Sequence, residues 1–299
     1  MSNTTAGVTL LDGGMGQELV ARGVAGSETL WSAAALLDAP EEVLAVHRDY
    51  IEAGADVITT NSYAAGRDRL EKVGVGHLFE QLNRTAGELA VRAREETHRP
   101  VRIAGSLGPL RGTFNPDAVG AFEELVPLYA EQAELLLPHV DLFLCETMST
   151  AEEARAALTA AAATGREVWV SWTLAEEGEA GALRDGSGIA AALAAVADLP
   201  VAAVLVNCVQ PERITAAMAA LVDSGRPAGG FANGFVGIPD GWVVTDGLPD
   251  ARNDLDAAAY AGHAIGWVDQ GAQIVGGCCE VGPAHIRRLR EQLDVLGST

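Results

Sequence analysis

The chain has 299 residues, of which 48% are hydrophobic, so it is long enough to bury a large core. Its 20 basic and 41 acidic residues give a formal net charge of −21, which argues against nucleic acid and anionic membranes as partners, because both require a positive protein surface. No apolar run approaches the roughly 20 residues of a transmembrane helix, and residues 1–7 lack the basic and apolar parts of a signal peptide, so we expect a cytoplasmic protein.

Short, nearly continuous apolar runs alternate with amphipathic helical patterns along the chain. The apolar runs predict eight strands, at residues 8–11, 56–60, 101–106, 141–145, 167–172, 202–206, 228–232 and 272–277. Each is followed by a helical pattern, and these patterns cover about residues 40–53, 77–97, 118–137, 150–163, 189–196, 211–222, 256–270 and 283–293. Strands that are apolar on both faces are typical of a parallel sheet covered by helices.

Eight successive strand–helix units predict an α/β protein of the (β/α)8 TIM-barrel type. An open, doubly wound sheet is the alternative. No G-x-G-x-x-G fingerprint follows the first strand, which weakens that alternative. Nothing in the chain marks a linker or a low-complexity break, so we expect one domain over residues 1–299.

Chemically capable side chains stand at the ends of the predicted strands, where barrel enzymes build their active sites. These residues are Asp12, Thr60, Asn61, Ser106, Glu146, Asn207, Cys208, Cys278 and Cys279. Three of the four cysteines and two acids would therefore meet at one mouth, whereas Cys145 falls inside a strand and is expected in the core. Taken singly, Asp12 could cap a turn, Glu146 could cap a helix, and Cys208 could be a small buried hydrophobe.

The two adjacent cysteines, Cys278 and Cys279, follow two glycines. A disulfide between neighbours is strained, and clustered cysteines in the cytoplasm more often bind metal or take part in catalysis. Flexible glycines let the backbone turn so that two thiolates can reach one ion. With Cys208 as the third ligand, the pattern predicts a Zn²⁺ site. The six histidines fall mostly in helices or their flanks, which leaves the fourth zinc position open.

A zinc site with three thiolates is a poor Lewis acid for activating water, which argues against a zinc hydrolase. It is better suited to binding another thiol and holding it deprotonated at neutral pH. The nearby acids Asp12 and Glu146 could pair with an ammonium group. A ligand that carries both a thiol and an ammonium group is an amino acid with a thiol side chain.

Five short segments, at residues 12–14, 53–56, 146–147, 207–208 and 276–279, resemble the zinc-dependent homocysteine S-methyltransferases. The resemblance runs in order from about Leu11 to Leu293. It implies a (β/α)8 barrel in which a methyl group passes by direct in-line attack of the homocysteine sulfur on an activated methyl carbon, giving methionine.

The resemblance also assigns roles to particular residues. Cys208, Cys278 and Cys279 become the zinc ligands, with the homocysteine sulfur as the fourth. The residues expected to bind homocysteine are Asp12 and Glu146 for its amino group, the amide of Gly13 and the hydroxyl of Thr60 for its carboxylate, and Asn207 as a support beside Cys208.

The methyl donor is the less defined substrate. Family members that use S-methylmethionine tend to carry a Tyr-Pro-Asn element after the seventh strand, whereas residues 231–235 read Phe-Ala-Asn-Gly-Phe. S-methylmethionine or S-adenosylmethionine is the expected donor. Aromatic residues of the rim loops could hold its cation or only pack the loops, and they are Trp31, Tyr63, Phe114, Trp172, Phe235 and Trp242. The alternatives are methylation of another thiol or selenol, such as selenocysteine, and a barrel that binds zinc and thiol without catalysis.

Overall fold

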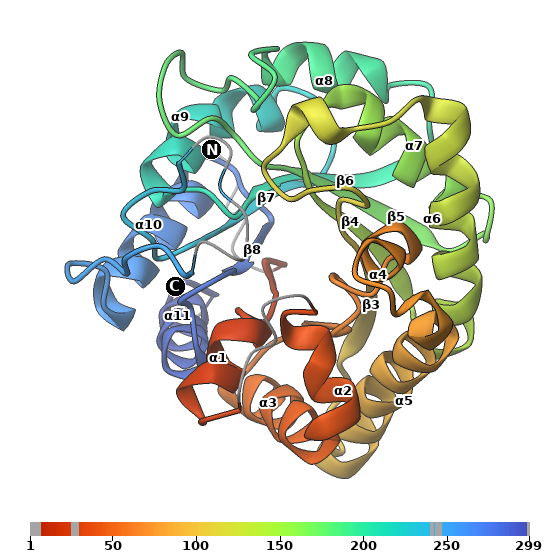
Figure 1. Ribbon diagram of the computed structural model, residues 1–299. Coiled ribbons are helices and arrows are strands. Elements are labelled where there is room, and N and C mark those ends of the chain that lie inside the picture. Colours follow the sequence, from red (N-terminus) through yellow and green to blue (C-terminus); the bar gives the residue numbers. More distant parts are fainter. Residues whose placement is uncertain (1–6, 25–29, 240–241, 243–246, 298–299) are drawn as a thin grey trace.

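The computed structural model describes residues 7–24, 30–239, 242 and 247–297. Eight parallel strands form a nearly closed barrel with helices around it (Figure 1), which confirms the predicted TIM-barrel fold. The strands are β1 (Thr9–Leu10), β2 (Val57–Thr59), β3 (Arg102–Leu107), β4 (Leu142–Met148), β5 (Glu167–Trp172), β6 (Val201–Asn207), β7 (Ala228–Ala232) and β8 (Ile274–Gly277).

The strand order is β1-β8-β7-β6-β5-β4-β3-β2, with every neighbouring pair parallel. The seam between β1 and β2 is closed by one parallel bridge, Leu11 with Val57, and the Asp12 amide donates to the Val57 carbonyl at 3.0 Å. Closure at this seam excludes the open, doubly wound sheet, whose outer strands would stay unpaired.

The helices that cover the barrel are α1 (Met15–Ala21), α2 (Ala35–Asp38), α3 (Pro40–Ala53), α4 (Arg67–Lys72), α5 (Phe79–Thr97), α6 (Phe122–Leu136), α7 (Ala151–Ala162), α8 (Ile189–Ala195), α9 (Pro211–Val222), α10 (Ala257–Asp269) and α11 (Pro283–Gly297). Short 3₁₀ turns lie at Ser32–Ala34, Gly76–Leu78, Pro116–Ala118 and Leu137–His139. Helix α3 starts with proline and ends at Gly54 with φ of 111°, as its sequence signals predict. None of the helices in the described ranges combines the length and apolarity needed to cross a membrane.

Two differences from the prediction concern the rim of the barrel. Helices α1 and α4 follow β1 and β2 in stretches too short and too polar to show a helical period. Strand β4 was expected to end at Cys145, but it continues to Met148 through an irregularity in its pairing with β5. Glu146 is therefore held by the sheet itself and not by a loop.

The barrel interior is filled by side chains that the strands point inward, among them Leu11, Leu144, Trp169 and Phe231. Side chains on the opposite face of the strands pack against the helices in a larger cluster, which includes the fully buried Cys145. Packing fills the barrel below the strand ends, so the polar strand-end residues face a cavity at its carboxyl-terminal mouth.

Candidate active site

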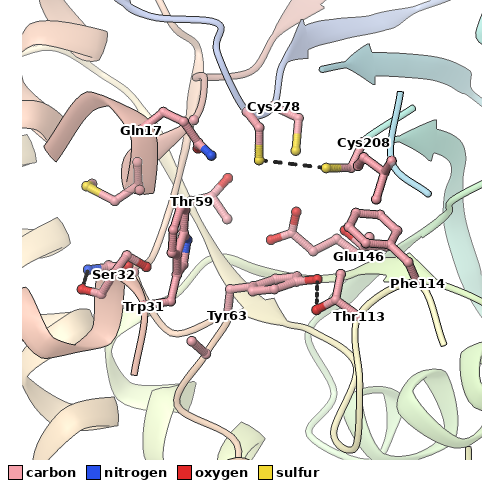
Figure 2. Close-up of a pocket in the computed structure, with 18 of the residues that line it drawn as sticks. Gln17, Trp31, Ser32, Thr59, Tyr63, Thr113, Phe114, Glu146, Cys208 and Cys278 are labelled. Atoms are coloured by element: carbon pink, nitrogen blue, oxygen red, sulfur yellow. Dashed lines mark hydrogen bonds between the residues drawn. The ribbon is translucent and has the colours of Figure 1, made fainter. Parts of the chain in front are cut away.

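A cavity of about 430 Å³ lies at the carboxyl ends of the strands (Figure 2). Its wall contains seven of the nine strand-end residues singled out in the sequence, namely Asp12, Thr60, Asn61, Glu146, Cys208, Cys278 and Cys279. Ser106 and Asn207 are fully buried behind the wall. The predicted convergence of acids and cysteines therefore occurs in one cavity.

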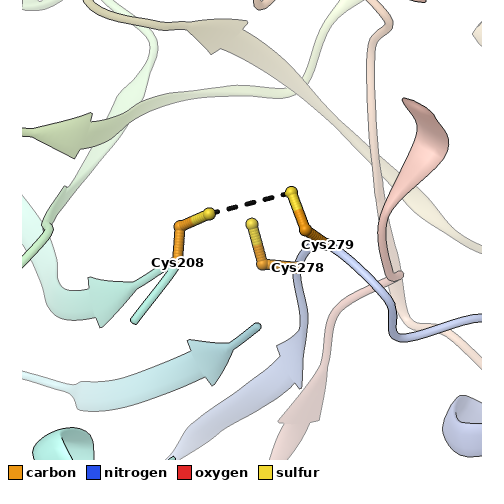
Figure 3. A group of neighbouring side chains, drawn as sticks. All are labelled: Cys208, Cys278 and Cys279. Atoms are coloured by element: carbon orange, nitrogen blue, oxygen red, sulfur yellow. Dashed lines mark hydrogen bonds between the residues drawn. The ribbon is translucent and has the colours of Figure 1, made fainter. Parts of the chain in front are cut away.

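The three cysteines form a compact sulfur cluster (Figure 3). The Sγ atoms of Cys208, Cys278 and Cys279 all lie within 4.8 Å of one another, and those of Cys208 and Cys279 are 3.8 Å apart. A tetrahedral Zn²⁺ with Zn–S bonds of about 2.3 Å would separate its sulfurs by about 3.8 Å. The cluster therefore has the spacing and the soft donor atoms of a three-thiolate metal site.

The backbone fixes the cysteines through the end of β7, which lies between their two loops. The amides of Cys208 and Cys278 donate to the carbonyls of Phe231 and Ala232 at 3.1 and 2.9 Å, and the Gly234 amide donates to the Cys279 carbonyl at 2.9 Å. Three loops are thus tied to one another before any metal binds, which preorganises the sulfur cluster.

Close backbone approach explains two glycines that follow β1. A Cβ atom at Gly14 would lie 2.6 Å from the Cys278 carbonyl oxygen, and one at Gly13 would lie 2.0 Å from the Val281 carbonyl oxygen. Any side chain at either position would push the loop of Asp12 away from the cysteine loop. These glycines bring the first acid and the sulfur cluster to the same cavity.

The thiols favour the protonated form when no cation is present. Hydrogen bonding to Cys208 and burial raise the pKa of Cys278 well above the ordinary thiol value. A bound divalent cation reverses this preference, because the metal binds the thiolate and releases the proton. The donor set thus fits a metal whose binding is coupled to loss of protons.

Asn207 is a support of the cavity wall and does not line it. Its Oδ1 accepts hydrogen bonds from the Thr147 amide at 2.9 Å and the Ser171 hydroxyl at 2.7 Å, and its Nδ2 donates to the Thr147 hydroxyl at 2.8 Å. The side chain therefore joins β4, β5 and β6 just before Cys208. Thr147 and Cys208 both have positive φ, 62° and 51°, so the bonds hold two strained backbone positions.

The two acids are buried and lack basic protein partners. Thr59 donates to Asp12 through its amide at 2.7 Å and its hydroxyl at 2.9 Å, and Ser106 donates to Glu146 through its hydroxyl. Burial raises the pKa of each carboxyl group to about 7, and repulsion from Glu146 adds to the shift at Asp12. Across the described chain, no basic side chain forms an ion pair with either acid. Two buried carboxyl groups of this kind are suited to binding the cationic group of a ligand.

The hydroxyl of Thr60 already forms hydrogen bonds with other residues of the cavity wall. It accepts from the Ser106 amide at 3.0 Å and lies 2.8 Å from the Ser62 hydroxyl. Ser62 donates its one proton to the Ser106 carbonyl at 2.8 Å, so Thr60 must donate its proton to Ser62. Thr60 can give a hydrogen bond to a ligand only if this chain of bonds rearranges.

Aromatic side chains form the apolar part of the cavity. Of the six rim candidates, Trp31, Tyr63, Phe114, Phe235 and Trp242 line it. Trp172 is fully buried in the core and does not. Phe114, Phe235 and Ile238 pack around Cys208, and Trp242 lies 6.0 Å from Phe114 between ring centroids. We refer to Phe114, Phe235, Ile238 and Trp242 as the apolar roof.

One buried arginine, which sequence reasoning missed, ties the roof together. The Arg184 side chain is 1% exposed and pairs with Glu176 at 3.1 Å. Its guanidinium lies 4.8 Å from the Phe114 ring centroid and donates to the Ile238 carbonyl at 3.2 Å. It thus links the loops after β3, β5 and β7. Nothing in the glycine-rich stretch around it signals this role, because Phe114 and Ile238, the roof residues that it contacts, are distant in sequence.

The fold and the site define an α/β-barrel enzyme with a three-cysteine cluster, able to hold a metal, at its catalytic end. The sequence model of one family, homocysteine S-methyltransferase, matches residues 9–293. The homocysteine S-methyltransferase of Escherichia coli strain K12 is 30% identical over 312 residues, covering 95% of this chain and 94% of its own. The chain therefore belongs to the homocysteine S-methyltransferase family, as its sequence motifs predict.

Two further relatives bear on the substrates and the metal. The crystal structure of the E. coli homocysteine methyltransferase MmuM in its metallated form superposes with a TM-score of 0.79 at 28% identity, covering 95% of this chain and 96% of that one. The selenocysteine Se-methyltransferase of Brassica oleracea var. italica is 28% identical over 319 residues, covering 97% of this chain and 90% of its own. The family as a whole implies homocysteine and a methyl donor as substrates.

Proposed function

We propose that the protein is a zinc-dependent enzyme that moves a methyl group from a small sulfonium donor, S-methylmethionine or S-adenosylmethionine, to the thiol of homocysteine. The products are methionine and the demethylated donor. The observation that carries this proposal is the meeting, in one cavity, of a three-cysteine cluster with two buried acids that have no basic partner among the described residues.

Cys208, Cys278 and Cys279 would hold the zinc ion, since their sulfur spacing matches tetrahedral thiolate coordination. Zinc bound there would supply a fourth position for the substrate sulfur and keep it deprotonated at neutral pH. The metallated form of the E. coli relative supports a metal at this site.

The acids orient the acceptor. Asp12 and Glu146 together bind the homocysteine ammonium group, and an ammonium between them lowers the raised pKa of both carboxyl groups. The Gly13 amide serves the carboxylate end. Asn207 acts through Thr147 and the backbone before Cys208, as a positioning residue and not as a substrate contact.

The apolar roof receives the methyl donor. Aromatic faces attract a sulfonium cation and exclude water from the reacting atoms. In the transfer, the homocysteine sulfur forms a bond to the methyl carbon while the bond from that carbon to the donor sulfur breaks. The electron pair of the broken bond stays on the donor sulfur, which leaves as a neutral thioether.

A second candidate acceptor is selenocysteine, which the similarity to the Brassica enzyme favours. A selenol is more acidic than a thiol and binds soft metals equally well, so the same cavity geometry serves both. The side chain of selenocysteine is one methylene shorter than that of homocysteine. Competition between the two acceptors in one reaction mixture will show which the cavity prefers.

The direct test is methionine formation by zinc-loaded protein from homocysteine, with S-methylmethionine, S-adenosylmethionine and glycine betaine assayed separately. We expect turnover with at least one sulfonium compound and little with betaine, a quaternary ammonium donor. Homocysteine binding without turnover on any donor would contradict catalysis and support a thiol-binding barrel. Absence of both binding and turnover would overturn the proposal altogether.

A further inference from the structure

The side chain of Gln17 lines the cavity without a hydrogen-bond partner among the described residues. Gln17, on α1, is 9% exposed and lines the cavity, and Figure 2 shows its carboxamide pointing into the open space. Its side chain makes no hydrogen bond with any residue of the described ranges. The Gln17 amide atoms are open to the cavity, so a bound molecule can replace water as their hydrogen-bond partner.

The position of Gln17 indicates which part of a ligand it meets. Helix α1 begins three residues after Asp12, so Gln17 and Asp12 belong to one continuous segment of the cavity wall. An α-amino acid whose ammonium group reaches Asp12 has its carboxylate two bonds farther on. The carboxylate of such an acceptor therefore stays close to this segment of the wall, to which Gln17 also belongs.

The carboxylate needs several donors, of which the Gly13 amide supplies only one. Asp12 and Glu146 repel it, and the proton of Thr60 is directed to Ser62. Three basic residues line the cavity, Arg69, Lys72 and Arg111. Arg111 pairs with Asp68 and Glu124, whereas Arg69 donates to the Thr113 hydroxyl at 3.0 Å and has a second guanidinium nitrogen without a partner among the described residues. The carboxamide of Gln17 offers two N–H groups and adds no charge that would compete for the acids.

We propose that Gln17 binds the α-carboxylate of the amino-acid acceptor and so helps the enzyme select an amino acid over a simple thiol. The inference rests on the proposed function, and it assigns to Gln17 a role that the sequence motifs do not. Gln17 was missed in the sequence because a glutamine next to Glu18 on a short helix is indistinguishable from a surface residue.

The test compares two acceptors that differ only in the carboxylate, L-homocysteine and 3-amino-1-propanethiol. Binding of each to zinc-loaded protein is measured by calorimetry, and methyl transfer is assayed in parallel. In Gln17→Met, which keeps the length but removes the hydrogen bonds, we expect the dissociation constant of homocysteine to rise about ten- to one-hundred-fold. That of 3-amino-1-propanethiol should stay within about twofold. The matched control is Gln81→Met on the exposed face of α5, which should bind both as the unaltered protein does.

The outcomes separate this inference from the proposed function. If the unaltered protein binds and methylates homocysteine but Gln17→Met loses nothing, Gln17 does not bind the carboxylate. Equal losses for both acceptors, or a loss confined to the KM of the methyl donor, would also overturn the inference. If the unaltered protein neither binds nor methylates homocysteine, it is the proposed function that fails.

Discussion

The side chain of Asn207 bonds both to the backbone amide and to the hydroxyl of Thr147, at 2.9 and 2.8 Å, across 60 residues of sequence. This pair connects the strand that carries Glu146 to the residue that precedes Cys208. The positions of Glu146 and Cys208 therefore depend on the same hydrogen bonds, and loss of these bonds should weaken the binding of both the metal and the substrate.

The first prediction tests this support. Asn207→Ala should lower zinc affinity about tenfold or more, since residues that orient metal ligands typically matter by 10- to 100-fold. The variant should also unfold more easily, by about 2–3 kcal/mol, because buried polar groups lose their partners. Zinc affinity is measured by competition with a chelator, and stability by urea unfolding.

Asn83 provides a matched control for Asn207. It is also fully buried and makes three side-chain hydrogen bonds, to the carbonyls of Ala65 and Phe79 and from Gln132. Asn83→Ala should lose similar stability and keep its zinc affinity. Equal zinc loss in both variants would mean that Asn207 matters only for folding.

The second prediction concerns the metal ligands. Cys208→Ala, Cys278→Ala and Cys279→Ala should each lower the zinc content from about one ion per chain to well below half after dialysis. Cys145→Ala, in the core, should retain its zinc despite the small cavity it creates. Elemental analysis of the four purified variants is sufficient, and zinc retained by all three ligand variants would exclude this site.

The third prediction is a pH dependence of stability. Folding raises the pKa of Asp12 from 3.8 and that of Glu146 from 4.5, in each case to about 7, chiefly by burial. Between those values the folded state binds more protons than the unfolded state, so the contribution of these acids to stability is highest at low pH and is lost as pH rises through 7. In metal-free protein, Asp12→Asn/Glu146→Gln should gain stability relative to the unaltered protein by roughly 5 kcal/mol from pH 5 to pH 8.5, since each of the two acids contributes about 1.4 kcal/mol per pH unit between pH 5 and its folded pKa of about 7.

Urea unfolding at several pH values provides the measurement for these acids. The control is Glu88→Gln/Glu95→Gln, which removes the same charge from two exposed positions on α5. Its stability should run parallel to that of the unaltered protein. A parallel profile for the Asp12 and Glu146 variant as well would mean that these acids ionise normally in the folded state.

The fourth prediction tests the roof. Arg184→Met should destabilise the protein by about 3 kcal/mol, since the largely buried Glu176 loses its ion-pair partner. Arg184→Met/Glu176→Gln should recover much of that stability. Neither variant keeps the guanidinium contacts to Phe114 and Ile238, so methyl transfer should fall about tenfold in both. Full activity in the stabilised double variant would show that Arg184 serves only the fold.

The eight-strand barrel could be predicted because its signals are local. Buried parallel strands are apolar along their whole length, and the helices between them begin and end at residues such as Pro40 and Gly54. Helices α1 and α4 were not predicted because six or seven residues are too few to show the helical period of apolar side chains. The end of β4 was placed too early because polarity usually marks a strand end, whereas Glu146 is polar and lies in an irregularity of the strand, which pairs again with β5 at Met148.

The sequence by itself determined which chemical groups gather at the mouth, because parallel strands of one barrel present all their carboxyl ends on one side. Cys208, Cys278 and Cys279 could be brought together on that rule alone. Only the tertiary structure decided which residues form hydrogen bonds with each polar side chain of the cavity. It showed that Asn207 and Thr60 bond to wall residues, and that the Gln17 side chain has no hydrogen-bond partner in the part of the chain that the structure describes. Strand topology follows from local periodicity, but hydrogen-bond partners depend on side-chain directions set by residues far away in the chain.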